Sequence, residues 1–297
     1  MLFVLLALWL WTPDKSRALL ESKYLNVPTD LIEVAGVKLH VRDSGAKNSP
    51  AVILIHGFGA SLHTWEPWAK VLATNHRVIR FDLPGSGLSS PDPTGNYTDA
   101  RSMQVLIALM EKLGVAKASI IGNSIGGRMA WTFAATHPER VDKLVLVSPD
   151  GFASPGFEYG KPPEVTGSMK LMRYVLPKFM LKMSLKPAYA DPNFLTDELT
   201  NRYFDLMLGE GSREALLARM AQTTLVDPVP LLKRIQAPTL LLWGEQDGMI
   251  PFANSAEYLK AIANVKLVSF NGVGHLPHEE APERSIVPVS EFLQIAN

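Results

Sequence analysis

The chain has 297 residues, and its 29 lysines and arginines are balanced by 29 aspartates and glutamates. This length accommodates one large domain, or a core with an insertion, around a well-buried interior. The balanced charge gives no indication of a polycationic surface, so no nucleic-acid partner is expected. The chain contains no cysteine, which excludes disulfides, thiolate catalysis and cysteine metal sites.

The first eleven residues, MLFVLLALWLW, are wholly apolar. They are too few to span a bilayer as a helix, which takes about 20 residues. A secretory signal has a basic residue before its apolar run and a small-residue cleavage site after it. This sequence shows neither feature, so a secretory signal fits it poorly. Two interpretations remain for residues 1–11: an interfacial membrane anchor or the end of a membrane helix, with Trp9 and Trp11 at the interface, or a segment packed on the protein itself. We expect residues 1–25 to form this segment, and the protein to be cytoplasmic or membrane-associated through it.

From residue 31 onward, strand patterns alternate with helical patterns. Residues 31–45 alternate around Ala35-Gly36 and predict a β-hairpin. Six short apolar runs, typical of strands buried on both faces, begin at Ala51, Arg77, Ala118, Lys143, Pro238 and Val265. Helical patterns cover residues 62–73, 99–113, 125–136 and 253–263. The alternation predicts an α/β fold with a mainly parallel sheet and helices on both faces, in which ligands bind at the carboxyl ends of the strands.

The segment between the runs at Lys143 and Pro238 contains no strand pattern. Helical patterns are present near residues 168–176, 178–185, 196–208 and 212–224, and six of the eleven methionines lie here. The segment is interpreted either as a lid whose methionines line a pocket or as an insertion that needs leucine and methionine for its own core. We expect a helical cap over residues 151–230, inserted between two parts of a core domain, 26–150 and 231–297.

Ser124 lies between a strand pattern, ASIIGN, and a helical pattern. The sequence GNSIG fits G-x-S-x-G in the context that a nucleophile elbow requires, with a strand before the serine and a helix after it. Gly122 and Gly126 remove side chains that would collide in a strained turn. A serine hydroxyl needs a neighbouring base to become a nucleophile, so Ser124 is the predicted nucleophile.

His275 follows the last strand pattern in the glycine-rich FNGVGHLPHEE and is the predicted base. His278 is its competitor, and the spacing HLPHE is not that of a metal site. Asp247 ends LLLWGEQD and is the predicted acid that orients the imidazole. Asp150, after VLVSP, and Glu245 are the alternative acids.

The second donor for a developing oxyanion should come from the loop HGFGAS, which follows the strand pattern at Ala51. The backbone N–H groups of Phe58 and Ile125 are the predicted donors. Asp82, in the glycine-containing turn FDLPGSGLSS, is interpreted as a structural residue that ties loops together.

With these residues in place, the chain resembles the α/β-hydrolase superfamily over nearly its whole length, from about residue 20. The motifs HGFG, FDLPGSGLS, GNSIGG, LLLWGEQD and GHLPHEE stand in the order and at the separations usual for that family. The resemblance implies an eight-stranded sheet with a helical cap inserted after the sixth strand, hydrolytic chemistry, and no cofactor. A serine nucleophile argues against the dehalogenase and epoxide hydrolase branches, which use aspartate.

The elbow GNSIGG is similar to that of carbon–carbon bond hydrolases that act on aromatic ring-cleavage products. Those enzymes usually have a Gly-Pro-containing oxyanion loop and a tryptophan after the catalytic histidine, whereas this chain has HGFGAS and Leu276. The first expectation is therefore a serine hydrolase of carboxylic esters with a small to medium apolar substrate. The alternatives are a carbon–carbon bond hydrolase and a ligand-binding protein with little catalysis. No interface pattern in the sequence indicates an oligomeric state.

Overall fold

The computed structural model describes residues 10–153 and 158–294, and its centre is an eight-stranded sheet with the order β1-β2-β4-β3-β5-β6-β7-β8. The strands are β1 Leu31–Val34, β2 Val37–Ser44, β3 Ala51–Ile55, β4 Arg77–Phe81, β5 Ala118–Asn123, β6 Val141–Val147, β7 Thr239–Gly244 and β8 Val265–Phe270. Every strand that the sequence predicts is present. The predicted eight-stranded α/β sheet is therefore confirmed.

The predicted hairpin is formed by β1 and β2. Its two turn residues have positive φ, 50° at Ala35 and 81° at Gly36, as the tight turn between right-twisted antiparallel strands requires. Strand β2 runs antiparallel to both β1 and β4, and the other described pairs are parallel. The carboxyl ends of β3, β5, β6, β7 and β8 consequently meet at one edge of the sheet.

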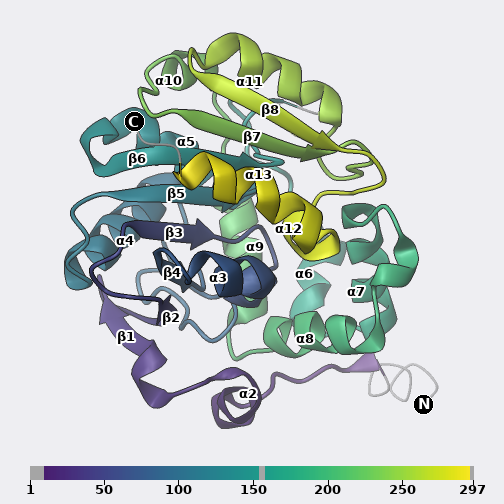
Figure 1. Ribbon diagram of the computed structural model, residues 1–297. Helices are drawn as coiled ribbons and strands as arrows, with labels where there is room; N and C mark the ends of the chain where they lie inside the picture. The colour runs from purple at the N-terminus through teal and green to yellow at the C-terminus, as the bar shows by residue number, and fades with distance from the viewer. Residues whose placement is uncertain (1–9, 154–157, 295–297) are drawn as a thin grey trace, which may run out of the picture.

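Helices cover both faces of the sheet, as Figure 1 shows. On one face lie α3 (Glu66–Leu72), preceded by η2 (Leu62–Trp65), and the C-terminal helix α13 (Pro282–Gln294), preceded by α12 (Pro277–Glu280). The other face packs against α4 (Asp99–Lys112), α5 (Ile125–Thr136), α10 (Val229–Leu232) and α11 (Ser255–Ala261). The remaining short 3-10 helices of the core are η1 (Pro28–Asp30), η3 (Pro138–Arg140) and η7 (Phe252–Asn254).

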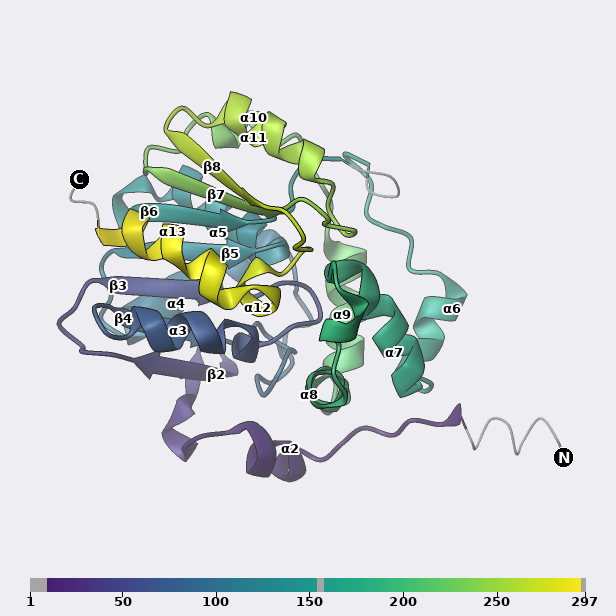
Figure 2. The same cartoon turned by 45° about the vertical axis from the view of Figure 1, so that its right-hand side comes forward.

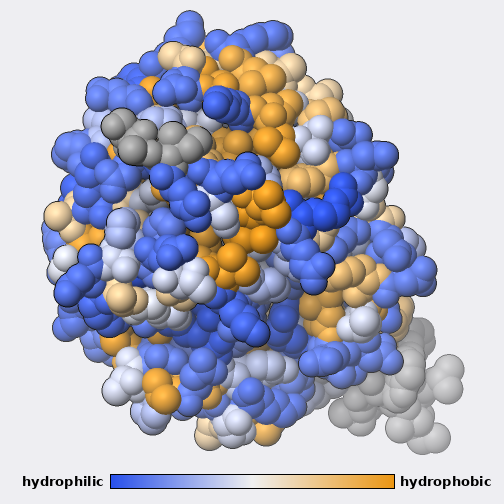
Figure 3. All heavy atoms as spheres, viewed as in Figure 1, coloured by the Kyte–Doolittle hydropathy of each residue, from blue (hydrophilic) through white to orange (hydrophobic). Residues whose placement is uncertain are grey.

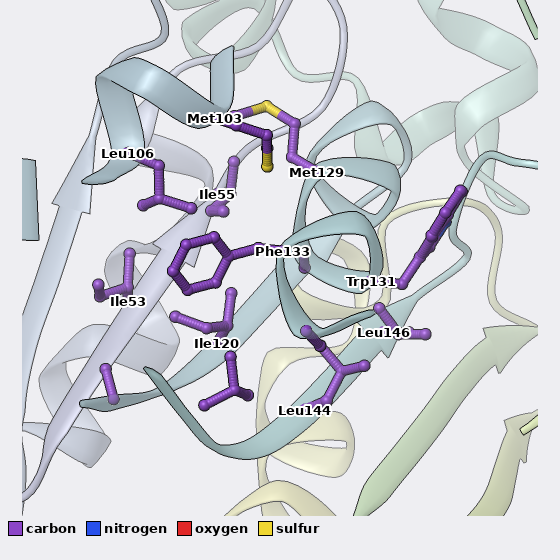
Figure 4. Close-up of a cluster of buried hydrophobic side chains, with 14 of the residues drawn as sticks. Ile53, Ile55, Met103, Leu106, Ile120, Met129, Trp131, Phe133, Leu144 and Leu146 are labelled. Atoms are coloured by element: carbon purple, nitrogen blue, oxygen red, sulfur yellow. The ribbon is translucent and has the colours of Figure 1, made fainter. Parts of the chain in front are cut away.

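The core on the α5 face positions the helix that follows Ser124. Phe133 of α5 is fully buried and packs in a cluster with Ile53 and Ile120 from the two central strands and with Leu106 of α4 (Figure 4). Removing a buried phenylalanine side chain from such a core typically costs about 3–5 kcal/mol. This packing fixes the direction in which α5 leaves β5.

Between β6 and β7 the chain forms a group of helices on one side of the sheet (Figure 2). They are α6 Gly167–Lys170, η4 Leu171–Arg173, α7 Lys178–Leu185, η5 Lys186–Ala188, η6 Pro192–Phe194, α8 Asp197–Met207 and α9 Ser212–Gln222. The helical insertion after the sixth strand is therefore present. The exact limits of the domains stay a prediction.

The sequence allowed two interpretations of the methionines in this insertion: lining of a pocket, or packing in a core of the insertion itself. Neither interpretation holds for the methionines as a group. Met220 lines the cavity beside Ser124. Met169, Met180 and Met183 are instead exposed at the surface. They belong neither to the lining of that cavity nor to a core of the cap.

The N-terminal part of the chain runs along the cap before it reaches the sheet. Helix α2 spans Arg17–Tyr24, and the Lys15 backbone bridges to Gly209. Residues 1–9 of the predicted anchor lie outside the described residues. Within residues 10–153 and 158–294, no helix has the length and apolar character to cross a bilayer.

We expect the protein to lose stability in mild acid, because the side chains of His56, His63 and His278 are buried. Burial lowers the pKa of His63 to about 4 and lowers the pKa values of His56 and His278 below the usual 6.5. As pH falls below about 6.5, these side chains take up protons more readily in the unfolded chain than in the folded one, and for His63 this range extends to about pH 4. Each then destabilises the fold by about 1.4 kcal/mol per pH unit.

Urea unfolding between pH 7.5 and 5 measures this effect. The free energy of unfolding should fall steadily below pH 6.5, and His278→Phe should have a shallower slope than the natural chain. A flat profile in the natural protein would contradict the assignment of neutral buried histidines.

Candidate active site

Ser124 sits in the sharp turn between β5 and α5, with the unusual dihedral angles φ 55° and ψ −121°. The turn exists because two glycines leave room for it. A Cβ atom on Gly122 would lie 2.1 Å from the carbonyl oxygen of Gly126, and one on Gly126 would lie 2.3 Å from that of Ile55. Either contact is closer than real Cβ atoms come to backbone. A non-glycine φ in this region is strained and is held only where the surrounding packing fixes it.

Asp247 and His275, from the loops after β7 and β8, meet in a hydrogen bond. The Nδ1 atom of His275 lies 2.7 Å from Oδ2 of Asp247, and both side chains are buried. The other carboxylate oxygen of Asp247 accepts from the backbone N–H groups of Met249 and Ile250, each at 2.8 Å. The carboxylate is thus fixed on both sides and holds the imidazole in one orientation.

Asn123, directly before Ser124, is hydrogen-bonded to the loop after β8 that carries His275, here called the histidine loop. Its buried amide Nδ2 donates to the carbonyl oxygens of Val147, at 3.1 Å, and His275, at 3.2 Å. The residue next to Ser124 therefore holds the backbone of His275 close to the end of β5. Within the described chain, no hydrogen bond joins the Ser124 hydroxyl to the His275 ring. Asn123 stands inside the GNSIGG motif but is not among the site residues predicted from the sequence.

The peptide bond between Gly57 and Phe58 is oriented by buried groups. The Gly57 carbonyl oxygen lies 2.8 Å from Nδ1 of His56, and Nε2 of His56 accepts from the Leu83 N–H at 3.0 Å. Burial lowers the pKa of His56, so its ring is neutral and donates through Nδ1. Because C=O and N–H point in opposite directions in a trans peptide, the Phe58 N–H is directed away from His56. It has no protein acceptor among the described residues.

The peptide bond between Ser124 and Ile125 is oriented in the same way. The Ser124 carbonyl accepts from the N–H groups of Arg128 and Asp150, each at 3.0 Å. The N–H of Ile125, at the first position of α5, has no acceptor within its helix. Because C=O and N–H are opposed in a trans peptide, this N–H is directed away from Arg128 and Asp150. A free N–H at a helix N-terminus favours developing negative charge.

A cavity of about 160 Å³ adjoins Ser124. It is lined by Phe58, Ser124, Ile125, Asp150, Pro163, Met220, Thr223, Met249 and Ile250. The lining contains the two predicted oxyanion residues and the predicted nucleophile together, and it is mostly apolar. Among the described residues, Asp150 is the one charged side chain that lines the cavity.

The alternative acids and the alternative base lie in other surroundings. Asp150 pairs with Arg128, with Oδ2 and Nη1 2.7 Å apart, and burial raises the pKa of its carboxyl. Glu245 accepts from the Ser269 hydroxyl at an exposed position. His278 is fully buried and stacks on Trp65, with ring centroids 3.9 Å apart. These contacts leave Asp247 as the acid bonded to His275.

Asp82 has the structural role that its turn predicts. Its carboxylate accepts from the N–H groups of Leu62 and Leu88 and lies 2.7 Å from Nδ1 of His40. It joins the loop after β3 to the loop after β4. In the part of the chain that the structure describes, no group of three acidic or histidine side chains is arranged to hold a metal ion.

One segment of the cap is bonded to both loops that carry the Asp247–His275 pair. The His275 N–H donates to the carbonyl of Ala188 at 2.8 Å, and the Gly248 N–H donates to that of Pro187 at 3.1 Å. Glu280 completes the contact from α12. Its two carboxylate oxygens accept from Ala190 at 2.8 Å on the cap and from Gly274 at 2.6 Å on the histidine loop.

Glu280→Ala should therefore lower kcat/KM about tenfold to hundredfold, because a small displacement of a positioned group has an effect of this size. Glu283→Ala, at an exposed position three residues away, is the matched control. Steady-state kinetics with a soluble ester, together with a thermal unfolding scan, separates loss of positioning from loss of fold. Equal activity of both variants would show that the contacts of Glu280 with the cap and the histidine loop do not position His275.

The chain matches the sequence model of the alpha/beta hydrolase fold over residues 50–282. It is 32% identical over 287 residues to a 2-hydroxy-6-oxononadienedioate/2-hydroxy-6-oxononatrienedioate hydrolase of Burkholderia vietnamiensis, which covers 92% of this chain and 96% of that protein. The names of such relatives fit the carbon–carbon bond alternative better than the expectation of an ester hydrolase.

Solved structures with similar folds include both reaction classes. A meta-cleavage product hydrolase from Pseudomonas fluorescens IP01 is 26% identical, with a TM-score of 0.77 over 91% of this chain and 100% of that one. A bacterial membrane phospholipase A is also 26% identical, with a TM-score of 0.74 over 89% of this chain and 84% of that one.

Proposed function

The chain belongs to the α/β-hydrolase fold family and is a hydrolase, and on that premise we propose that it cleaves carboxylic esters of small to medium apolar substrates through an acyl-enzyme on Ser124. The observation that carries the choice of ester is the charge of the cavity beside Ser124. The described residues that line it are apolar apart from two hydroxyl side chains and Asp150, and none of them is cationic. An uncharged acyl group fits such a lining.

In the proposed reaction, the Ser124 oxygen attacks the ester carbonyl while Nε2 of His275 takes the hydroxyl proton. Asp247 holds Nδ1 and stabilises the imidazolium that forms. The N–H groups of Phe58 and Ile125 stabilise the oxyanion. The proton then passes from His275 to the departing alkoxide, and a water activated by the same imidazole releases the acid and regenerates Ser124.

The second candidate is hydrolysis of a carbon–carbon bond, which the names of the relatives favour. Those names describe dioates, which carry two carboxylates at neutral pH. A buried carboxylate in a substrate needs a cation or several donors as partners. The buried guanidinium of Arg128, which pairs with the cavity residue Asp150, is also paired with Asp99, which is why we place the ester reaction first.

Parallel kinetics on p-nitrophenyl butyrate and on a ring-cleavage dienedioate decides between the two reactions. We expect kcat/KM for the ester to exceed that for the dienedioate. The reverse order would establish the carbon–carbon reaction and overturn our choice. Ligand binding without turnover of either substrate would instead indicate a binding protein.

Asp150→Asn should change the substrate preference without disabling the enzyme. Removing the carboxylate leaves Arg128 with the more exposed Asp99 as its one carboxylate partner among the described residues, and the cavity becomes attractive to anions. We expect KM for an ester with a terminal carboxylate on its acyl chain to fall about tenfold, because a charge-assisted hydrogen bond contributes about 1.5–3 kcal/mol. KM for the uncharged ester of the same length should stay within about threefold. Kinetics on the two substrates measures the ratio, and an unchanged ratio would contradict the role of Asp150.

A further inference from the structure

The outer side of the cap exposes large apolar side chains on adjacent short helices. The residues are Met169 of α6, Leu171 of η4, Tyr174 directly after η4, and Phe179, Met180 and Met183 of α7. We call this set the apolar cap face. Phe179 and Met183 are 60% and 62% exposed, although they belong to a well-formed helix. Figure 2 shows α6 and α7 at the periphery, on the side of the cap away from the sheet.

The spacing on α7 puts the apolar residues on one side of the helix. Phe179 and Met183 are four residues apart, and Met180 and Met183 are three apart, so all three share a face. Leu181 is buried on the side toward the cap interior. The helix thus has a second apolar surface that no other described element covers. Figure 3 shows apolar residues at the surface over α7, bordered by hydrophilic ones.

The charged residues of the segment that carries the apolar cap face are all basic. Between residues 165 and 186 the sequence carries basic side chains and no acidic one. The basic residues are Lys170, Arg173, Lys178, Lys182 and Lys186. Lys182 pairs with Asp197, whereas Lys170, Arg173 and Lys186 have no carboxylate partner within the described residues. Exposed apolar residues interleaved with lysine and arginine are typical of a helix that lies in the interface of an anionic membrane.

The N-terminal chain leads to this same face. Trp11 is 53% exposed and stacks on Tyr174, with ring centroids 5.8 Å apart. The Thr12 N–H donates to the Tyr174 carbonyl at 2.8 Å, and the Thr12 hydroxyl accepts from the Leu176 N–H at 3.1 Å. The apolar sequence MLFVLLALW therefore joins the described chain directly beside the apolar cap face.

We propose that the apolar cap face, with the basic residues around it, is a docking surface for an anionic lipid bilayer. Tryptophan and tyrosine favour the headgroup level, where one end of the ring is apolar and the other is hydrated. Lysine and arginine at the rim bind the lipid phosphates. The cap contributes its own contact with the membrane, in addition to any contribution of residues 1–11, so cap variants in the full chain test it directly.

The absence of cysteine makes a site-specific probe straightforward. M183C in the full chain carries one environment-sensitive fluorophore on the apolar cap face. L259C, on α11, carries the same label at a different exposed apolar position. With vesicles of phosphatidylcholine containing phosphatidylglycerol, the label at 183 should shift to the blue and brighten, and the label at 259 should not. No shift at 183, or equal shifts at both positions, would overturn the proposal.

The charge contribution is measured by co-sedimentation with the same vesicles. Each basic residue at an anionic surface contributes about fivefold to partitioning, so K170Q/R173Q/K186Q should lower it by about a hundredfold. K70Q/K112Q/K266Q removes the same charge from exposed positions elsewhere and should change partitioning far less. Hydrolysis of a soluble ester confirms that each variant is folded. Equal partitioning of the two triple variants would show that the basic residues of the cap do not bind the anionic bilayer. This outcome would not affect the proposed ester hydrolysis, which is measured separately.

Discussion

Replacing Ser124 by alanine should abolish hydrolysis, with kcat for p-nitrophenyl butyrate falling by about 10⁶-fold, as the loss of a nucleophile does when the rest of the site is intact. The physical reason is that no other described hydroxyl occupies the turn between β5 and α5. Alanine keeps a Cβ atom in the strained conformation of Ser124 and changes only the reacting group. The fold should therefore survive, and thermal unfolding should change little.

Ser148 provides the matched control for this experiment. It is a buried serine at the end of a strand and has a positive φ of 42°, like Ser124, but it does not line the cavity. Ser148→Ala should keep both activity and labelling by a fluorophosphonate probe, whereas Ser124→Ala loses both. Labelling of Ser124→Ala at the natural rate would refute the assignment of the nucleophile.

The arrangement of the sheet was predictable because each strand is a short apolar run bounded by turn residues. Once the chain alternates between strands and helices, right-handed crossovers bring the carboxyl ends of the parallel strands to one edge. Asp247 and His275 are 28 residues apart and still meet there. Their contact follows from topology and strand ends, which local sequence patterns indicate well.

The contacts between the cap and the catalytic loops could not be predicted in the same way. Glu280 is 90 residues from Ala190, and no periodicity relates a carboxylate on a short helix to the backbone of a distant segment. The pairing of Asp150 with Arg128 likewise depends on how β6 and α5 pack, which side-chain type alone does not reveal. Only Asn123 had an available signal, since it stands in the elbow motif.

The surface of the cap was not predicted because α7 is only eight residues long. A helix of this length shows apolar residues on both sides, and the sequence pattern cannot tell which side faces the protein. Leu181 is buried, whereas Met180 is exposed one position away. Both sequence interpretations of the methionines, pocket lining and internal core, assumed that apolar residues turn inward.

Replacing Asp247 by asparagine should lower kcat about 10⁴-fold and leave the fold intact, as loss of the orienting carboxylate does in a triad of this kind. The side-chain oxygen of asparagine can still accept from the N–H groups of Met249 and Ile250. Its amide N–H₂ then faces Nδ1 of His275, which must accept rather than donate. The ring is driven to the tautomer with its proton on Nε2, and that nitrogen can no longer take the proton of Ser124.

Asp150→Asn makes this test specific, because it removes a carboxylate of the same size from the cavity but leaves the Asp247–His275 hydrogen bond unchanged. With an uncharged ester, its kcat should stay within about tenfold of that of the natural enzyme. The tautomer argument adds a pH signature: Asp247→Asn should recover part of its rate at high pH, where hydroxide replaces the missing base. If Asp150→Asn loses activity as severely as Asp247→Asn, the acid that serves His275 has been assigned wrongly, and the raised pKa of Asp150 would mark it as part of the proton-transfer machinery.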